Sequence, residues 1–398
     1  MKNIVNKNKV LDNTIILILI IVILGQRIAI NISDIQFSVS FLILFILIFF
    51  WLANKQIKFD KKRLILFLVS IISVTFSASI SSIYSLSFSI TSILLLLILY
   101  FPTVLRFTVP KQILLLKTFQ TILLFLSIIG ILQFISQFIG LQARDWLSFL
   151  PKENILLNYN YMAPIEFGSN IYKSNGIFFA EPSFFSQFVS LSIIIELYLW
   201  KRYNRILILL PALLFSFSGT GLILLMVGLF PLLYKMNWKK LLPIGILFIS
   251  IIIAFIYSGF ATYTLKRVEE LRNPYTSGYI RFISPYSTYW EHFKQSDNFI
   301  EIIFGMGPGV SEDYQWHKPT YFNPLMKLVV EYGLFGLPFF AYLIFVFFSS
   351  RPYWLSLILF IFYSILSGGL LTPQITVIHY LLLIFHKNDN LQKSFTIK

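Results

Sequence analysis

Four cationic side chains lie close together between residues 266 and 281, and their chemistry suits an anion with several oxygens. Lys266, Arg267, Arg272 and Arg281 fall within sixteen residues, and Glu269 and Glu270 are the acids among them. Arginine has a planar fork that binds phosphate oxygens two at a time. The spacing therefore predicts a phosphate or diphosphate site. The competing interpretation is a helix surface on which Lys266 and Arg267 pair with the two glutamates.

Carboxylates provide a second kind of chemistry. Pro182 fits the first position of a helix, so Glu181 would lie at the positive end of the helix dipole, as a cap or as a general base that grips a substrate hydroxyl. Lys327 and Glu331 are four residues apart and predict an ion pair, because an unpaired charge in a membrane costs roughly 2.5 to 3.5 kcal/mol. Glu196, near the end of its apolar segment, can extend to the membrane surface and needs no special role.

Aromatic side chains accompany these charges and offer flat faces on which sugar rings can stack. They are Trp146, Tyr159, Tyr161, Tyr172, Tyr286, Tyr289, Trp290, Tyr314, Trp316 and Tyr321. The competing interpretation is a belt of aromatic residues at the membrane–water interface.

The elements that must position these groups are apolar helices. Of the 398 residues, 57% are hydrophobic and 12% are charged, whereas about 25% are charged in soluble globular proteins. Apolar blocks of nearly membrane-spanning length predict an all-α polytopic membrane protein with about twelve transmembrane helices. The predicted segments are 13–30, 37–53, 64–80, 88–105, 112–139, 182–200, 205–217, 220–234, 241–259, 323–349, 353–367 and 370–385.

The distribution of charge predicts the orientation of these helices. With both termini in the cytoplasm, the inside segments hold 21 Lys and Arg but only three acids, as the positive-inside rule requires. Residues 1–398 then form a single integral membrane domain with two long outer loops, at 140–181 and 260–322. The segments 205–217 and 220–234 are short, so one long kinked span is the alternative there.

Several classes of function are excluded or disfavoured. The net charge of +15 does not indicate nucleic acid as a partner, because the excess cations lie in short loops on one side of the membrane. The chain has no Cys, and its four His form no metal-binding pattern; His379 is expected in the core. Because the inside loops are short and carry no phosphate-binding glycine motif, no nucleotide site is expected there. We expect neither a metal nor another cofactor.

Several segments resemble one family, the bacterial O-antigen polymerases of the Wzy type, which share a superfamily with the O-antigen ligases. The resembling segments are Gly176 to Ser183 (GIFFAEPS), the turn Phe217 to Gly221 (FSGTG), Ser277 to Arg281 (SGYIR), Phe304 to Gly309 (FGMGPG) and Asn323 to Gly336 (NPLMKLVVEYGLFG). Their order along the chain, over roughly residues 170 to 340, carries the resemblance.

The resemblance implies a C-type glycosyltransferase-like fold in the bacterial plasma membrane. It implies a polymerase that joins oligosaccharide repeat units on undecaprenyl diphosphate at the outer face, without metal or nucleotide. The implied partners are this lipid-linked oligosaccharide, the lipid bilayer, a chain-length regulator and a flippase. The candidate catalytic residues are Arg281 and Arg267, which would neutralise the departing diphosphate, and Glu181 or His317, which would orient or deprotonate the acceptor hydroxyl. The implied diphosphate- and glycan-binding residues are Arg144, Lys173, Arg272, Tyr286, Trp290 and Asn323.

Two departures from the family pattern bear on this interpretation. Lys173 stands where an arginine is common, which would weaken bidentate phosphate binding. The ligase-type histidine would align at Phe322 and is absent, which favours a polymerase, although His317 could substitute.

Three alternatives remain open on the sequence. A ligase would transfer a finished glycan to another acceptor. A polysaccharide flippase or other carrier would have paired polar residues at mid-membrane and repeat symmetry, and a membrane receptor or structural protein would show no turnover.

Overall fold

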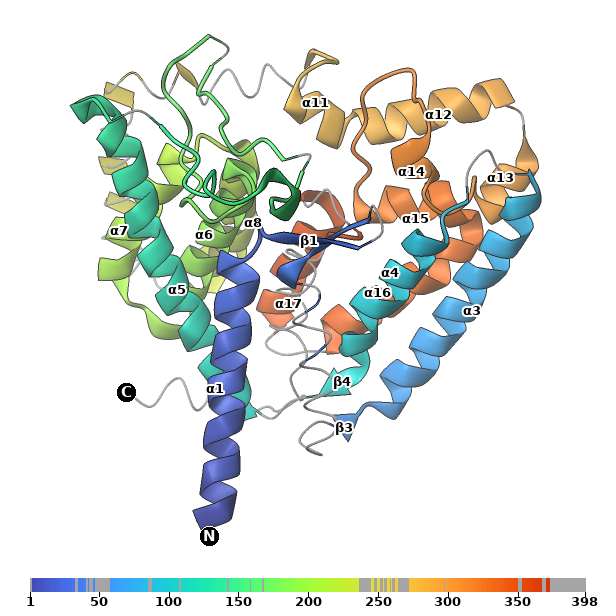
Figure 1. Ribbon diagram of the computed structural model, residues 1–398, viewed down its shortest axis with the longest axis horizontal. Helices are drawn as coiled ribbons and strands as arrows, with labels where there is room; N and C mark the ends of the chain where they lie inside the picture. Colours follow the sequence, from blue (N-terminus) through green and yellow to red (C-terminus); the bar gives the residue numbers. More distant parts are fainter. Residues whose placement is uncertain are drawn as a thin grey trace. The chain divides into compact units, whose positions relative to one another are not determined.

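The protein is described here by a computed structural model, shown in Figure 1. The described residues are 2–32, 35–40, 42, 46, 58–84, 88–106, 109–141, 143–157, 159–166, 168–235, 245–246, 249–250, 253, 256–257, 259, 262–263, 272–296, 298–349, 353–366 and 370–372. These residues are mostly helical. Among them, four helical segments are long and apolar enough to cross a membrane, namely Lys61–Tyr84, Ile113–Ile139, Pro182–Trp200 and Pro324–Ser349. The chain therefore has the character of an α-helical membrane protein.

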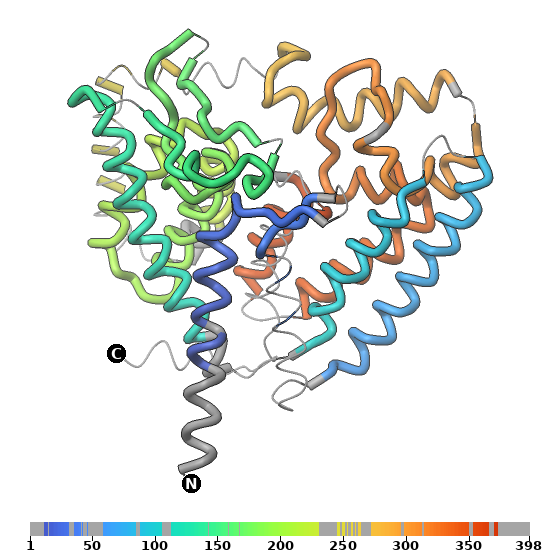
Figure 2. Tube along the Cα trace, in the orientation of Figure 1, coloured from blue at the N-terminus to red at the C-terminus, as the bar shows by residue number. Residues whose placement is uncertain are grey.

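The chain forms two compact units, and each combines segments that are far apart in the sequence. The first unit holds Met1–Leu44, Ile113–Arg267 and Gln392–Lys398, and the second holds Phe45–Gln112 and Val268–Leu391. In Figure 2 the sequence colours mark the described residues of each unit. The expectation of a single membrane domain over 1–398 stays a prediction.

The first unit is built from helices and one β-hairpin. Its elements are α1 (Lys2–Leu24), β1 (Ala29–Ile32), β2 (Ile35–Ser38), α5 (Val109–Ile135, entering the unit at Ile113), η2 (Ser136–Ile139), η3 (Lys152–Asn154), α6 (Pro182–Ile195), η4 (Glu196–Trp200), α7 (Tyr203–Phe215) and α8 (Gly219–Lys235). Between η2 and α6, the described residues form turns and the short helix η3.

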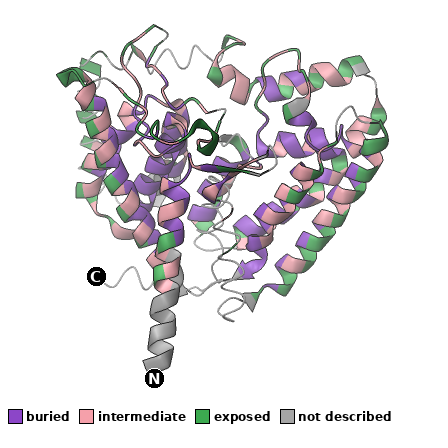
Figure 3. Cartoon of the chain, in the orientation of Figure 1, coloured by how far each residue is buried: buried purple, intermediate pink, exposed green. Residues whose placement is uncertain are grey.

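Helix α6 is the central helix of this unit. It packs against α7 and α8, and its residues from Phe184 to Ile195 are all buried (Figure 3). Small residues allow α8 to approach closely, since a Cβ atom at Gly221 would lie 2.6 Å from the Cβ of Ser186, and one at Gly228 would lie 2.2 Å from Ile194. The turn at Phe217 (φ 46°) separates α7 from α8, so they are two helices and not one kinked helix.

The β-hairpin corrects two predicted helices. Helix α1 ends at Leu24, and the following residues enter β1, which pairs antiparallel with β2 in the register Ala29 to Ser38. The segments 13–30 and 37–53 are therefore not helical throughout. Isoleucines favour strands as readily as buried helices, and a run of apolar residues does not distinguish the two.

The second unit contains the other helices. Its elements are β3 (Lys58–Phe59), α3 (Lys61–Tyr84), α4 (Ile90–Tyr100), η1 (Phe101–Val104), β4 (Leu105–Arg106), α11 (Ser277–Phe282), α12 (Ser284–Ser296), α13 (Phe299–Phe304), α14 (Val310–Asp313), α15 (Pro324–Tyr332), η6 (Gly333–Gly336), α16 (Leu337–Ser349), α17 (Tyr353–Ile361) and η7 (Phe362–Leu366).

The predicted helix at 323–349 is interrupted in its middle. Helix α15 ends at Tyr332, Gly333 has φ 57°, and the turn η6 leads into α16. The interruption exposes carbonyl groups that need hydrogen-bond donors. Serines of α3 supply them, because Ser77 Oγ donates to the carbonyl oxygen of Tyr332 (3.1 Å) and Ser73 Oγ donates to that of Phe335 (2.8 Å).

Most of the remaining predicted segments are confirmed as helices. These are 64–80, 88–105, 112–139, 182–200, 205–217, 220–234 and 353–367, with ends that differ by a few residues. The segment 241–259 and the segment 370–385 lie mainly outside the described residues, as does His379. Twelve membrane spans, the side on which each loop lies and the position of the termini stay predictions.

Candidate functional site

Two short helices of the second unit carry Arg281 and Tyr286. Arg281 lies in the last turn of α11 and is partly buried, and Tyr286 lies in the first turn of α12. The backbone N–H of Tyr321 donates to the carbonyl oxygen of Ile280 (3.1 Å). The chain just before α15 is thereby held beside the helix that carries Arg281.

A cluster of hydroxyl groups strengthens this connection. Ser284 Oγ donates to the carbonyl oxygen of Pro319 (2.9 Å) and lies 2.6 Å from Thr320 Oγ1. Thr288 Oγ1 lies 3.1 Å from Ser284 Oγ and 3.2 Å from Thr320 Oγ1. Because Ser284 and Thr288 are buried, these hydroxyls satisfy one another in place of water.

Tyr286 and Asn323, both predicted to bind substrate, are in direct contact. Asn323 is the N-cap of α15, where its Oδ1 accepts from the backbone N–H of Met326 (2.9 Å). Its Nδ2 donates to the hydroxyl oxygen of Tyr286 at 2.9 Å. Asn323 is buried, whereas Tyr286 remains 45% exposed. A buried amide thus orients an exposed phenol.

Helix α15 carries a stripe of buried polar residues, which we call the α15 polar stripe: Asn323, Lys327 and Glu331. Their spacing of four places them on one face of the helix, one turn apart. Lys327 Nζ lies 2.6 Å from Glu312 Oε1 and 3.5 Å from Glu331 Oε1. The predicted ion pair of Lys327 with Glu331 is confirmed, but Glu312 is the closer partner.

The glycine-rich segment FGMGPG covers the end of this stripe. The backbone N–H of Met306 donates to the carbonyl oxygen of Val330 (2.8 Å), and that of Gly307 donates to the carbonyl oxygen of Glu331 (3.1 Å). A Cβ at Gly305, whose φ is +72°, would lie 2.4 Å from the carbonyl carbon of Glu331. Only glycine permits this backbone conformation at this distance. Ser311 Oγ then donates to Glu331 Oε1 (2.5 Å).

Aromatic side chains cover the other face of this segment. Tyr289, Tyr314 and Trp316 pack against a buried cluster that consists of Met306, Val310, Phe322, Met326 and Val330. His292 Nε2 lies 3.0 Å from Glu301 Oε2. Burial, with the nearby carboxylate of Glu301, raises the pKa of Tyr289. Phe322, at the position of the ligase-type histidine, is therefore part of an apolar core.

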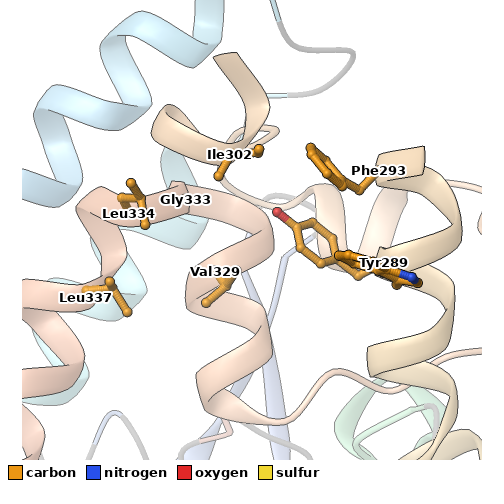
Figure 4. Close-up of a pocket in the computed structure, with 8 residues that line it drawn as sticks. Tyr289, Phe293, Ile302, Val329, Gly333, Leu334 and Leu337 are labelled. Atoms are coloured by element: carbon orange, nitrogen blue, oxygen red, sulfur yellow. The ribbon is translucent and has the colours of Figure 1, made fainter. Parts of the chain in front are cut away.

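An apolar pocket of about 200 Å³ lies between α12, α13, α15 and the start of α16 (Figure 4). It is lined by Tyr289, Trp290, Phe293, Ile302, Val329, Gly333, Leu334 and Leu337. Trp290 is 57% exposed, and its ring lies 5.3 Å from Lys294 Nζ. The pocket therefore combines an apolar interior with an aromatic residue and a cation at its edge.

Other predicted site residues belong to the first unit. Glu181 occupies the N-cap position of α6 and Pro182 is the first helical residue, but the Glu181 side chain makes no capping hydrogen bond to the helix. The Glu181 carboxylate accepts from Ser183 Oγ (2.7 Å) and from the backbone N–H of Asn160 (3.5 Å). Lys173 is partly buried, and Arg144 is exposed. These residues lie on the segment that leads from η2 to α6.

Buried amides hold that segment. Gln133 Nε2 donates to Asn175 Oδ1 (2.9 Å), and Gln133 Oε1 accepts from the backbone N–H of Asn175 (3.1 Å). Asn175 Oδ1 also accepts from the backbone N–H of Ile177, which has φ 67°. The segment GIFFAEPS therefore begins at a fixed, unusual backbone conformation.

The remaining predicted residues are exposed or outside the described residues. Arg272 and His317 are exposed residues of the second unit, and Arg267 lies outside the described residues together with Lys266, Glu269 and Glu270. In the described part of the chain, no group of three or more His, Asp or Glu residues could hold a metal ion.

Two structural predictions on individual residues are wrong. Glu196 is fully buried and does not reach the surface; its carboxylate accepts from Arg202 Nε (2.9 Å) and Nη2 (2.7 Å). Tyr161 is buried, so it offers no face to a sugar. The Arg27 guanidinium carbon lies 3.3 Å from the centre of its ring.

Arg27 is one of two important residues that the sequence patterns missed. Its Nη1 and Nη2 each donate to a carboxylate oxygen of Asp145 at 2.7 Å. Burial raises the pKa of Tyr161 to about 12 although Arg27 opposes this. One sequence feature could have identified Arg27, because it is a charged residue at the end of an apolar segment. The other missed residue is Glu312. Its position three residues after the glycine-rich turn could have identified it.

Comparison with known protein families, with curated proteins and with solved structures finds no match.

Proposed function

We propose that this protein is a membrane glycosyltransferase of the O-antigen polymerase type. It would join oligosaccharide repeat units carried on undecaprenyl diphosphate at the outer face of the bacterial plasma membrane. The observation that carries the proposal is the hydrogen bond of 2.9 Å between Asn323 and Tyr286, next to the chain that holds the Arg281 helix. Asn323 begins the segment NPLMKLVVEYGLFG, whose Val330 and Glu331 carbonyl oxygens accept hydrogen bonds from FGMGPG. Ile280 of SGYIR accepts one from Tyr321, two residues before Asn323.

The diphosphate is the part of the substrate that needs positive charge. Arg281 would bind its oxygens and stabilise the charge that develops as the sugar departs, and such electrostatic stabilisation is commonly the main source of the rate enhancement. Arg272, an exposed residue of the same unit nine positions before Arg281, would assist. An activated lipid diphosphate needs no nucleotide, because the bond to be broken is already that of a good leaving group.

The sugar and lipid parts of the substrate need aromatic and apolar surfaces. Tyr286 and Trp290 are exposed on α12 and would stack against sugar rings. The apolar pocket beside Trp290 has the lining that an isoprenoid chain requires. His317, in the same unit, would help to orient the acceptor hydroxyl.

The test is incubation of the purified protein with an undecaprenyl-diphosphate repeat unit, without metal or nucleotide, followed by gel electrophoresis of the products. The proposal expects a ladder in which each band has one more unit. A single unchanged band with several candidate glycans, from protein that is folded by circular dichroism, would contradict it.

A further inference from the structure

The α15 polar stripe places one amide and two charged side chains in the protein interior. Asn323, Lys327 and Glu331 are buried in a helix that is long and apolar enough, with α16, to cross a membrane. Buried charges are costly unless they are paired, and they often mark functional sites in membrane proteins. A lysine and a glutamate alone would neutralise each other.

A third charged group is nevertheless present. Glu312 Oε1 lies 2.6 Å from Lys327 Nζ, closer than the 3.5 Å of Glu331 Oε1. Two carboxylates thus share one ammonium group. One oxygen of Glu331, Oε2, is buried and has no hydrogen-bond partner among the described residues. The charged groups around Lys327 are therefore one ammonium and two carboxylates, and not a neutral pair.

Glu312 differs from the rest of the cluster in its exposure. Its side chain is 67% exposed, while that of Lys327 is 4% exposed. The backbone N–H of Glu312 donates to the carbonyl oxygen of Gly309 (3.0 Å), so the glycine-rich turn fixes the main chain below it. A buried cation and a rigid turn thus hold an accessible carboxylate in one position.

The same stripe also holds Tyr286. Asn323, which binds the Tyr286 hydroxyl, is four residues before Lys327, which binds Glu312. Residues four apart on a helix have Cβ atoms about 5–6 Å apart. An exposed phenol and an exposed carboxylate are therefore anchored one turn apart on one helix.

We infer that Glu312 is the carboxylate that binds and deprotonates the acceptor sugar hydroxyl, and that Lys327 is the residue that positions it. This inference rests on the proposed function. The acceptor oxygen forms a bond to the anomeric carbon of the donor, and the bond from that carbon to the diphosphate oxygen breaks. The electron pair leaves with undecaprenyl diphosphate, and the hydroxyl proton passes to the Glu312 carboxylate.

The test compares the rate of ladder formation in wild type, Glu312→Gln and Glu312→Ala. The Gln variant keeps an oxygen that can accept from Lys327 Nζ, so its fold should be preserved. A general base contributes about 10²- to 10⁴-fold in rate, so both variants should lose at least about 100-fold while still binding the lipid-linked unit. Sodium formate should restore part of the activity of the Ala variant, because formate replaces the missing carboxylate.

The control is Glu291→Gln, a matched change at another partly exposed glutamate of the second unit that also pairs with a lysine. It should keep the wild-type rate. A Glu312→Gln variant that forms ladders within threefold of wild type would overturn the inference and leave the proposed function intact. A loss in Glu312→Ala that formate does not restore would also overturn it, in favour of a structural role. A wild-type protein that forms no ladder would overturn both proposals.

Discussion

Replacement of Arg27 by Ala should destabilise the first unit substantially. The Arg27 side chain is 5% exposed, that of Asp145 is 28% exposed, and two hydrogen bonds of 2.7 Å join them. The guanidinium carbon also lies 3.3 Å from the centre of the Tyr161 ring. Arg27 thus connects the end of α1 to the segment between η2 and α6.

The magnitude follows from burial. Removal of one partner of a buried ion pair costs about 3–5 kcal/mol, and the partial exposure of Asp145 reduces this to about 2–3 kcal/mol. The lost contact with the Tyr161 ring adds about 1 kcal/mol. The Arg27→Ala variant should therefore lose about 3–4 kcal/mol. Since 1 kcal/mol shifts the melting temperature of a domain of this size class by about 2–4 °C, the fall should be roughly 6–16 °C.

The effect should depend on pH in a defined direction. Burial tends to raise the pKa of Asp145, but the hydrogen bonds from Arg27 and from the backbone N–H of Leu147 outweigh it and hold the pKa below its usual value. The stabilisation is therefore present above the ordinary aspartate pKa of about 4 and is lost as the pH falls through the lower pKa of the folded state. The Arg27→Ala variant should lack most of this acid sensitivity.

The assay is thermal unfolding of the purified protein in detergent, with Arg27→Ala, Asp145→Ala and the double variant at pH 7 and at several acid pH values. The matched control is the pair Lys318 and Glu291, which has the same distance of 2.7 Å but side chains that are 35% and 44% exposed. Disruption of that pair should cost less than about 1 kcal/mol. Equal losses for the two pairs, or strictly additive effects of the Arg27 and Asp145 changes, would refute the reasoning.

Three further predictions follow from the packing and from the proposed chemistry. Gly305→Ala would place a Cβ 2.4 Å from backbone atoms of Glu331, whereas Gly140 has a similar φ but no atom within 4 Å of such a Cβ. Gly305→Ala should therefore lower the free energy of unfolding by at least about 2 kcal/mol more than Gly140→Ala does. Equal losses would contradict the role given to close approach. Glu196→Ala should cost about 2–3 kcal/mol in the same assay, because it leaves Arg202 without its buried partner, and a loss under about 0.5 kcal/mol would argue against this pair. Arg281→Ala should slow ladder formation by about 10²- to 10³-fold at equal expression, and a wild-type ladder would rule out its assignment.

Much of the helical structure could be predicted from the sequence. Apolar segments such as 64–80 and 182–200 coincide with α3 and with α6 and η4, because burial of long apolar runs favours helices. The turn Phe217 to Gly221 and the cap position of Glu181 were also predictable, since they depend on residues adjacent in the chain. The hairpin of β1 and β2 was not, because its strands satisfy the same apolar criterion as a helix.

Part of the candidate site could likewise be predicted from the sequence, and part could not. The sequence alone identified the segments SGYIR, FGMGPG and NPLMKLVVEYGLFG, the ion pair of Lys327 with Glu331, and Tyr286 and Asn323 as separate candidates. Only the tertiary structure joined Tyr286 to Asn323 and brought Glu312 to Lys327. Hydrogen bonds between residues 37 or 15 positions apart depend on where whole helices pack, and local sequence preferences do not fix that packing.

The contact between Arg27 and Asp145 shows this limit most clearly. These residues are 118 positions apart, and Tyr161, which the sequence offered as a sugar-stacking face, is buried under Arg27. A charge at the end of an apolar segment needs a partner in any fold. Which carboxylate and which ring supply it was decided by the folding of the segment between η2 and α6 against the end of α1 and β1.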